Sequence, residues 1–251
     1  MSSDQSAAML IIGNEILSGR TADANVKFFA NILGKQGIPL YEVRVVRDIE
    51  IEIIEATLAL AEKYDYVFTT GGIGPTHDDI TTASIAKAFT VKLELHKPSL
   101  EKMESYYGAH LNEARKKMAF LPEGSVPIET RITSAPGFRI HNVFVMAGVP
   151  IIAQAMLESV LDTLPNGMPV LSRFVEAYIA EGDLADIMDA IQTEYPDIDL
   201  GSYPFFRNET VGLSVVAKGR NIDSINSAIE KIATHIKTLG HELTIDAELP
   251  N

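Results

Sequence analysis

Residues 66–81 read YVFTTGGIGPTHDDIT, and this stretch decides the fold that the sequence predicts. The run Tyr66–Thr70 is typical of a buried strand, the glycines after it predict a tight turn, and a helix is expected to begin near Ile80. A strand followed by a glycine-rich turn and a helix is one unit of a parallel sheet with helical crossovers. The segments on either side repeat the same alternation.

Working outward, short loops separate further strands and helices. The predicted elements are a strand at 8–12, a helix at 26–36 with Gly37 as its C-cap, a strand at 40–46, a helix with apolar positions from Ile51 to Ala61, an interrupted helix at 98–120, a strand at 143–146 and a helix that Pro150 begins. This order predicts an α/β fold with a doubly wound, mostly parallel sheet. The first domain is expected to span 7–165.

The segment Leu164–Pro169, which contains two prolines and a glycine, is the predicted domain boundary. The elements predicted after it are strands at 173–180, 200–206 and 211–218, helices with apolar stripes at 184–191 and 222–236, and a hairpin turn at Arg207-Asn208-Glu209. The order βαββα indicates a smaller, ferredoxin-like α/β domain over 170–245.

Composition and charge exclude several classes of function. The 251-residue chain carries 34 acidic and 21 basic side chains, a formal net charge of −13, with no dense run of Lys or Arg. Such a chain repels polyanions, so no nucleic-acid partner is expected. The absence of cysteine excludes disulfides and thiolate metal sites. No apolar run reaches the ~20 residues of a membrane span, and residues 1–6 lack a basic export signal, so we expect a cytoplasmic protein without a membrane partner.

The glycine turn after the strand at 66–70 is the first candidate site. In an open parallel sheet, ligands bind beyond the carboxyl ends of the strands, and glycines let phosphate oxygens reach backbone amides. Asp78 and Asp79 follow the turn, and two carboxylates tolerate a phosphate only if a divalent cation bridges them. The alternative interpretation is a simple tight turn in which Asp79 is the N-cap of the next helix.

Other turns at the same end of the predicted sheet carry polar groups. Glu15 follows the first strand within a turn that begins at Gly13, Asp48 follows the second strand, and Gly148 follows the strand at 143–146. Three carboxylate-bearing loops at one edge strengthen the prediction of a cation and phosphate site. The sequence lacks the motifs of three other kinds of site. It has no dinucleotide-binding glycine fingerprint, no P-loop Gly-Lys-Ser/Thr and no Gly-x-Ser-x-Gly elbow.

Five ordered motifs carry a resemblance to a known family. They are Ile12–Gly19, Thr70–Thr81, Leu121–Gly124, Ala135–Phe138 and Gly148–Pro150. Together they resemble the amino-terminal part of the CinA competence/damage-inducible family, which shares its molybdopterin-binding-like domain with MoaB, MogA, gephyrin and the N-terminal region of FAD synthases. The second predicted domain is similar to the small domain that follows in CinA and FAD synthase. The carboxyl-terminal amidohydrolase domain of full-length CinA is not expected in this chain.

The resemblance implies two activities, which remain open alternatives. One is metal-dependent hydrolysis of nucleotide pyrophosphates such as ADP-ribose or FAD, and the other is binding of molybdopterin without catalysis. It also implies roles for individual residues: Asp78 and Asp79 as catalytic groups; Gly71, Gly72, Gly74, Thr76, Gly13, Gly148 and Lys117 as ligand- or phosphate-binding groups; and Asp78, Asp79, Glu15 and Asp48 as ligands of Mg, Mn or Co.

Four positions depart from the family pattern, and self-association is a further expectation. Ala147 stands where CinA-type sequences usually have proline, Ile152 where they have glutamate, Arg115 where they have asparagine and Met118 where they have glutamine. The loss of two polar groups leaves open whether the site is catalytic. Because relatives form dimers or trimers, we expect a homo-oligomer that binds a small nucleotide or pterin.

Overall fold

The structure is a computed structural model that describes residues 5–207 and 209–246. The chain divides into two compact units between Gly167 and Met168, and each is described by itself. Asn208, the central residue of the predicted hairpin turn, lies outside the described residues.

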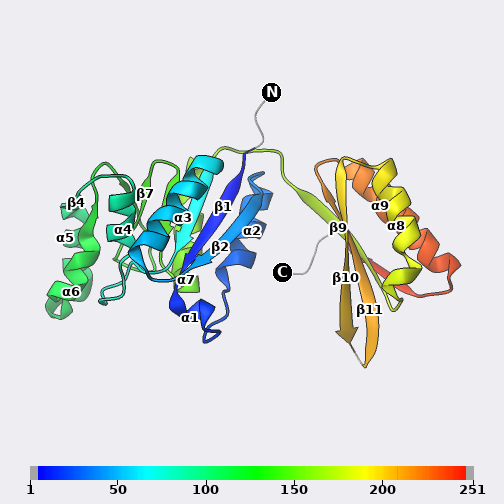
Figure 1. The fold of residues 1–251 in the computed structure, drawn as a ribbon, viewed down its shortest axis with the longest axis horizontal. Helices are drawn as coiled ribbons and strands as arrows, with labels where there is room; N and C mark the ends of the chain where they lie inside the picture. The colour runs from blue at the N-terminus through cyan, green and yellow to red at the C-terminus, as the bar shows by residue number, and fades with distance from the viewer. Residues whose placement is uncertain (1–4, 208, 247–251) are drawn as a thin grey trace. The chain divides into compact units, whose positions relative to one another are not determined.

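The first unit is built on a six-stranded sheet with the order β2-β1-β3-β8-β7-β6, of which Figure 1 labels β1, β2 and β7. Its strands are β1 (Ala7–Ile12), β2 (Leu40–Val46), β3 (Tyr66–Thr70), β6 (Val126–Ile128), β7 (Gly137–Ile140) and β8 (Val143–Met146). The pairs β2-β1, β1-β3 and β3-β8 are parallel, whereas β7 and β6 run antiparallel to their neighbours. The predicted mostly parallel α/β sheet is thus confirmed.

Helices cover both faces of this sheet, as a doubly wound fold requires. Phe29 and Leu33 of α2 (Asn25–Lys35) and Leu157 of α7 (Pro150–Val160) pack on one face. On the opposite face lie buried residues of α3 (Glu50–Lys63) and α4 (Thr81–Ala88). All six residues of β1 are buried, which is expected of a central strand with helices on both sides.

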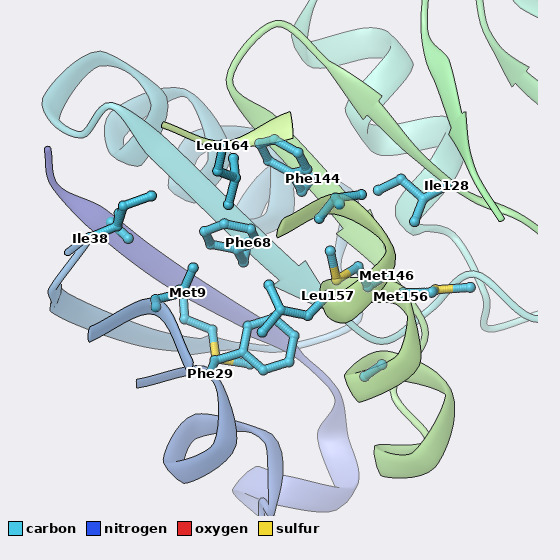
Figure 2. Close-up of a cluster of buried hydrophobic side chains, with 14 of the residues drawn as sticks. Met9, Phe29, Ile38, Phe68, Ile128, Phe144, Met146, Met156, Leu157 and Leu164 are labelled. Atoms are coloured by element: carbon cyan, nitrogen blue, oxygen red, sulfur yellow. The ribbon is translucent and has the colours of Figure 1, made fainter. Parts of the chain in front are cut away.

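The first core is centred on aromatic rings, as Figure 2 shows. Phe68 and Phe144 stack with ring centroids 5.0 Å apart, and Phe29 meets Phe68 edge-on at 5.9 Å. These rings come from β3, β8 and α2, so the core ties the two central parallel strands to the helix beside them. Offset and edge-on ring pairs of this kind add stability beyond the burial of their surface.

The stretch predicted as an interrupted helix at 98–120 is more broken than expected. It contains α5 (Lys97–Tyr107), α6 (Glu113–Lys116) and 3₁₀ turns at 108–110 and 117–119. Phe120 is not helical but begins β5 (Phe120–Pro122), which pairs with β4 (Leu93–Leu95) in a separate two-stranded sheet. The remaining elements of this unit are α1 (Asn14–Leu17) and a 3₁₀ turn at 161–163.

The second unit is an antiparallel sheet with the order β10-β11-β9-β12. Its elements are β9 (Leu171–Ala177), a 3₁₀ turn at 181–183, α8 (Ala185–Glu194), β10 (Ile198–Arg207), β11 (Thr210–Gly219), α9 (Ile222–Thr238) and β12 (Leu243–Asp246). This is the predicted ferredoxin-like arrangement. The main differences from the prediction are that β9 spans Leu171–Ala177 rather than 173–180 and that a fourth strand, β12, follows the last helix.

Among the described helices, none is both long and apolar enough to cross a membrane.

Candidate functional site

The candidate site lies where the first sheet changes its winding direction. The chain passes from β1 to β2 on one side and later returns to β3 on the other side of β1. In open parallel sheets, the loops that leave the strands at such a switch point diverge and leave a crevice for a ligand. Here those loops begin at Gly13, after β1, and at Gly71, after β3.

Three turns meet at this end of the sheet. The Gly71 N–H donates to the Met146 carbonyl at 3.2 Å, which joins the turn after β3 to the end of β8. A Cβ atom at Gly71 would lie 2.0 Å from the Ile12 carbonyl oxygen, and a Cβ at Gly148 would lie 3.3 Å from the Gly71 Cα. Gly71 also has a φ of +106°, which side chains rarely adopt. Close backbone contact therefore fixes glycine at position 71.

The loop after β3 presents backbone donors that nothing in the described part of the chain accepts. The N–H groups of Gly72, Ile73 and Gly74 make no hydrogen bond to any described residue. The loop is anchored on its other side, because the Thr81 N–H donates to the Gly72 carbonyl at 3.0 Å. Consecutive unpaired N–H groups form a concavity with positive potential, which is the geometry that binds anions.

Asp79 holds the shape of this loop. Its Oδ2 accepts hydrogen bonds from the Thr76 N–H at 2.8 Å and from the Thr76 hydroxyl at 2.5 Å. The same oxygen lies over Gly74, where a Cβ would come within 2.6 Å of it. The alternative interpretation of Asp79 as the N-cap of the next helix is wrong, because α4 begins at Thr81 and its N-cap is Ile80, which makes no side-chain cap hydrogen bond.

Asp78 is the carboxylate of the loop that faces solvent. Its side chain is 67% exposed, and its Oδ1 lies 4.0 Å from Nδ1 of the almost fully exposed His77. The pKa of Asp78 is lowered, first by the Thr76 hydroxyl and then by a backbone N–H and by His77. Asp78 is therefore ionised at neutral pH and free to meet a cation.

The other two predicted metal ligands, Glu15 and Asp48, make their contacts within the turns after β1 and β2. The Glu15 carboxylate folds back over Gly13, where a Cβ would lie 2.5 Å from its Oε1. Asp48 Oδ2 accepts a hydrogen bond from the Asn14 N–H at 2.8 Å. Across the described ranges, no three His, Cys, Asp or Glu side chains lie close enough to hold a metal ion. The four predicted ligands thus do not form a ready metal centre.

The remaining predicted residues have different surroundings. The Thr76 N–H and hydroxyl both donate to Asp79, and the same hydroxyl also lowers the pKa of the neighbouring Asp78. Gly148 contacts Gly71 and accepts a hydrogen bond through its carbonyl. Lys117 is exposed in the 3₁₀ turn at 117–119, and it makes no ion pair or side-chain hydrogen bond with the described residues.

Sequence reasoning missed Asn25, the first residue of α2. Only 2% of its surface is exposed, and its Nδ2 donates to the Gly148 carbonyl at 3.1 Å. Within the part of the chain that the structure describes, the buried Oδ1 has no partner, and neither do the buried hydroxyls of Thr70 and Thr81. A buried asparagine near a glycine turn is a recognisable signal once the fold is known, but the pattern around Asn25 predicts only a helix start.

Comparison with known proteins identifies relatives for both units. Residues 8–166 match the family described as "probable molybdopterin binding domain", and residues 169–240 match the family described as "FAD synthase, middle domain". A protein of Thermococcus kodakarensis designated TK1472 is 33% identical over 254 residues, covering 94% of this chain and 98% of its own length. The crystal structure of the protein CinA from Thermoplasma acidophilum, whose function is described as unknown, is 34% identical with a TM-score of 0.60. It covers 64% of this chain and 99% of its own.

Proposed function

Because the chain belongs to the molybdopterin-binding-domain family and has a CinA-like first unit, we propose that this unit binds a phosphate-bearing small molecule, a nucleotide or a pterin, on the loop after β3. The observation that carries the proposal is the row of unpaired N–H groups from Gly72 to Gly74. Phosphate oxygens are the acceptors that such a row fits. The open side of the loop, at 75–78, is exposed and admits a ligand.

A phosphate bound at this loop would be repelled by the negative charge around it, so we expect a cation to bind with it. Asp78 lies in the phosphate-binding loop, and the whole chain has a formal net charge of −13. Mg²⁺ is commonly held by one or two carboxylates together with phosphate oxygens rather than by a cage of protein ligands. One exposed, ionised carboxylate fits this mode, whereas a site made of protein ligands alone does not. We assign Asp78 to the cation and Asp79 to the loop.

The reaction that we propose is hydrolysis of a nucleotide pyrophosphate such as ADP-ribose or FAD. With Asp78 as its protein ligand, a divalent cation bound together with the ligand would supply polarisation of the phosphate and a bound water of lowered pKa. The protein residues bind and orient the substrate. The N–H groups of residues 72–74 hold phosphate oxygens, and Asp79 maintains the shape of the loop by fixing Thr76. Asp78 compensates the charge of the cation.

A second candidate, binding of a pterin phosphate without turnover, is favoured by two observations. The described residues bring no third carboxylate to Asp78 and Asp79. In addition, Ile152 and Met118 replace polar residues that the CinA pattern has at these positions. Both candidates use the same loop and differ in whether a bond is broken.

Product analysis and calorimetry separate the two candidates. We expect ADP-ribose or FAD to be cleaved in the presence of Mg²⁺, Mn²⁺ or Co²⁺, and the heat of binding to be larger with the metal than without it. Tight binding of a pterin phosphate with no cleavage of either nucleotide would select the second candidate. If neither kind of ligand binds with any metal, the proposed function is wrong.

Two neighbouring substitutions test the division of roles between the aspartates. Asp78→Asn is expected to remove the metal-dependent part of binding and leave the metal-free part within about twofold. Asp79→Asn weakens two charge-assisted hydrogen bonds that shape the loop, so both parts should weaken by about 1–3 kcal/mol. Glu62→Gln, on the exposed side of α3, removes a charge elsewhere and is the control. Equal effects of the two loop variants would contradict the assignment.

A further inference from the structure

A cavity of about 1040 Å³ lies in the first unit, between α5, the loop from β6 to β7 and α7. Lys102 and Tyr106 of α5 form one wall, and Glu158 and Ser159 of α7 form another. None of its lining residues belongs to the glycine loop after β3 or to the turns after β1 and β8. Its volume is that of an ordinary small-molecule site.

The loop side of this cavity is rich in hydrogen-bond donors. The Thr130 hydroxyl oxygen accepts from the N–H groups of Ile132 and Thr133 at 3.2 and 3.3 Å, and the Thr133 hydroxyl oxygen accepts from the Ala135 N–H at 3.2 Å. The Ser134 hydroxyl is buried without a partner. A hydroxyl whose oxygen already accepts keeps its own hydrogen to donate. The Thr130 and Thr133 hydroxyls therefore each keep a hydrogen that a ligand can accept, whereas the Ser134 hydroxyl is too deeply buried to reach a ligand.

One basic side chain of the lining, Arg131, has no acidic partner among the described residues. Lys102 is paired with Glu129, whereas the guanidinium of Arg131 makes no ion pair or hydrogen bond with any described residue. Glu158 on the opposite wall keeps the total formal charge of the lining at zero, since two basic and two acidic side chains line it. A guanidinium binds a carboxylate through two parallel hydrogen bonds, so the unpaired Arg131 suits a ligand with one carboxylate group.

Apolar surface beside Arg131 suits a flat ring. Tyr106 is 65% exposed and Ile132 is 47% exposed, and both line the cavity. Exposed aromatic side chains bury flat apolar groups with little loss of conformational freedom and stack with rings at centroid distances of roughly 4.5–7 Å. A ring bearing an anionic group would place the ring on Tyr106 and the anion on Arg131.

We propose that this cavity, which is lined by residues outside the phosphate loop, is a binding site for a small aromatic carboxylate. The carboxylate pairs with Arg131 and accepts hydrogen bonds from the hydroxyls of the loop from β6 to β7, and the ring lies against Tyr106 and Ile132. This inference does not depend on the proposed function, because no residue of the phosphate loop takes part in it.

The test uses 2-naphthoate and its neutral analogue 2-naphthamide, followed by fluorescence anisotropy of the naphthalene ring in the full chain, which has no tryptophan. We expect 2-naphthoate to bind at least 10-fold more tightly than the amide. Arg131→Gln should remove this preference, and Arg131→Lys should keep part of it. Tyr106→Leu should weaken both ligands alike. Arg115→Gln removes an arginine that does not line the cavity and should change either affinity by less than twofold.

Competition distinguishes this site from the phosphate loop and the carboxylate from a phosphate ester. Excess inorganic pyrophosphate should not displace 2-naphthoate, and AMP should bind more weakly than 2-naphthoate. Four results would overturn the proposal: no binding of 2-naphthoate, equal affinity for acid and amide, an unchanged preference in Arg131→Gln, or tighter binding of AMP that depends on Arg131. Thermal unfolding of each variant confirms that it is folded, and the ratio of the two affinities does not depend on the folded fraction.

Discussion

Gly71 shows how one residue sets the geometry of the phosphate loop. Its backbone packs on the Ile12 carbonyl, and neither partner can move without displacing a strand. We predict that Gly71→Ala lowers the free energy of unfolding of the first unit by at least about 2 kcal/mol, from steric overlap and a strained φ. Gly34→Ala is the matched control, because Gly34 lies within α2 with open space around it and should gain about 0.5–1 kcal/mol. Urea unfolding followed by circular dichroism measures both.

Glu42 gives a prediction for the dependence of stability on pH. Hydrogen bonds from Lys63, Arg44 and Tyr64 lower the pKa of its carboxyl from 4.5 to about 2. A depressed pKa means that the folded state prefers the ionised form, so this stabilisation is complete above pH 4.5 and is lost as the pH falls toward about 2. The stability difference between the native chain and Glu42→Gln should therefore shrink over this range, as acid titrations of both will measure. A difference that is constant from pH 6 to pH 2 would contradict the assigned pKa.

At the scale of the element, α9 depends on its N-cap. The Asn221 side chain accepts hydrogen bonds from the N–H groups of Asp223 and Ser224 at 3.1 and 3.4 Å. Asn221→Ala leaves these donors without a protein partner and should lower the free energy of unfolding of the second unit by about 1 kcal/mol. Asn221→Asp keeps an acceptor and should change stability by much less. An equal loss of stability in Asn221→Ala and Asn221→Asp would show that the hydrogen bonds accepted by this side chain do not stabilise α9.

Elements with a strong local signal were predictable from the sequence. The strands at 40–46, 66–70 and 143–146 have the predicted bounds, since continuous or alternating apolar runs end at clear turn residues. β5 and β12 were not predicted, because each is short and is held by a partner strand far away in the sequence. Local periodicity carries no information about such pairing.

The candidate site was predictable only in part, for a similar reason. The glycine loop is a local pattern, and the structure places it at the switch point with its N–H groups unpaired. The directions of the carboxylates are set by contacts that the pattern does not specify. Asp79 turns onto Thr76 and Asp48 onto Asn14, so acids on neighbouring loops do not converge. Asn25 becomes relevant only when α2 packs beside the turn after β8.

At the scale of the whole molecule, the two units have separate cores. The buried clusters of the first unit lie between Ala7 and Leu164, and that of the second lies between Val175 and Ile236. We predict two unfolding transitions in calorimetry. Ile229→Ala, at a fully buried position of α9, should lower only the transition of the second unit, by about 3 kcal/mol. A single transition that shifts as a whole would contradict separate folding.

The contact between Gly37 and Gly167 has a consequence for how the chain leaves the first unit. A Cβ on Gly37 would lie 2.4 Å from the Gly167 carbonyl carbon, and the Gly167 N–H donates to the Gln36 carbonyl at 2.9 Å. The tether to β9 therefore starts from a fixed anchor and consists of residues 168–170 alone. Insertions that lengthen this tether are best tolerated after Gly167. A side chain at Gly37 or Gly167 would instead push the two backbone segments apart.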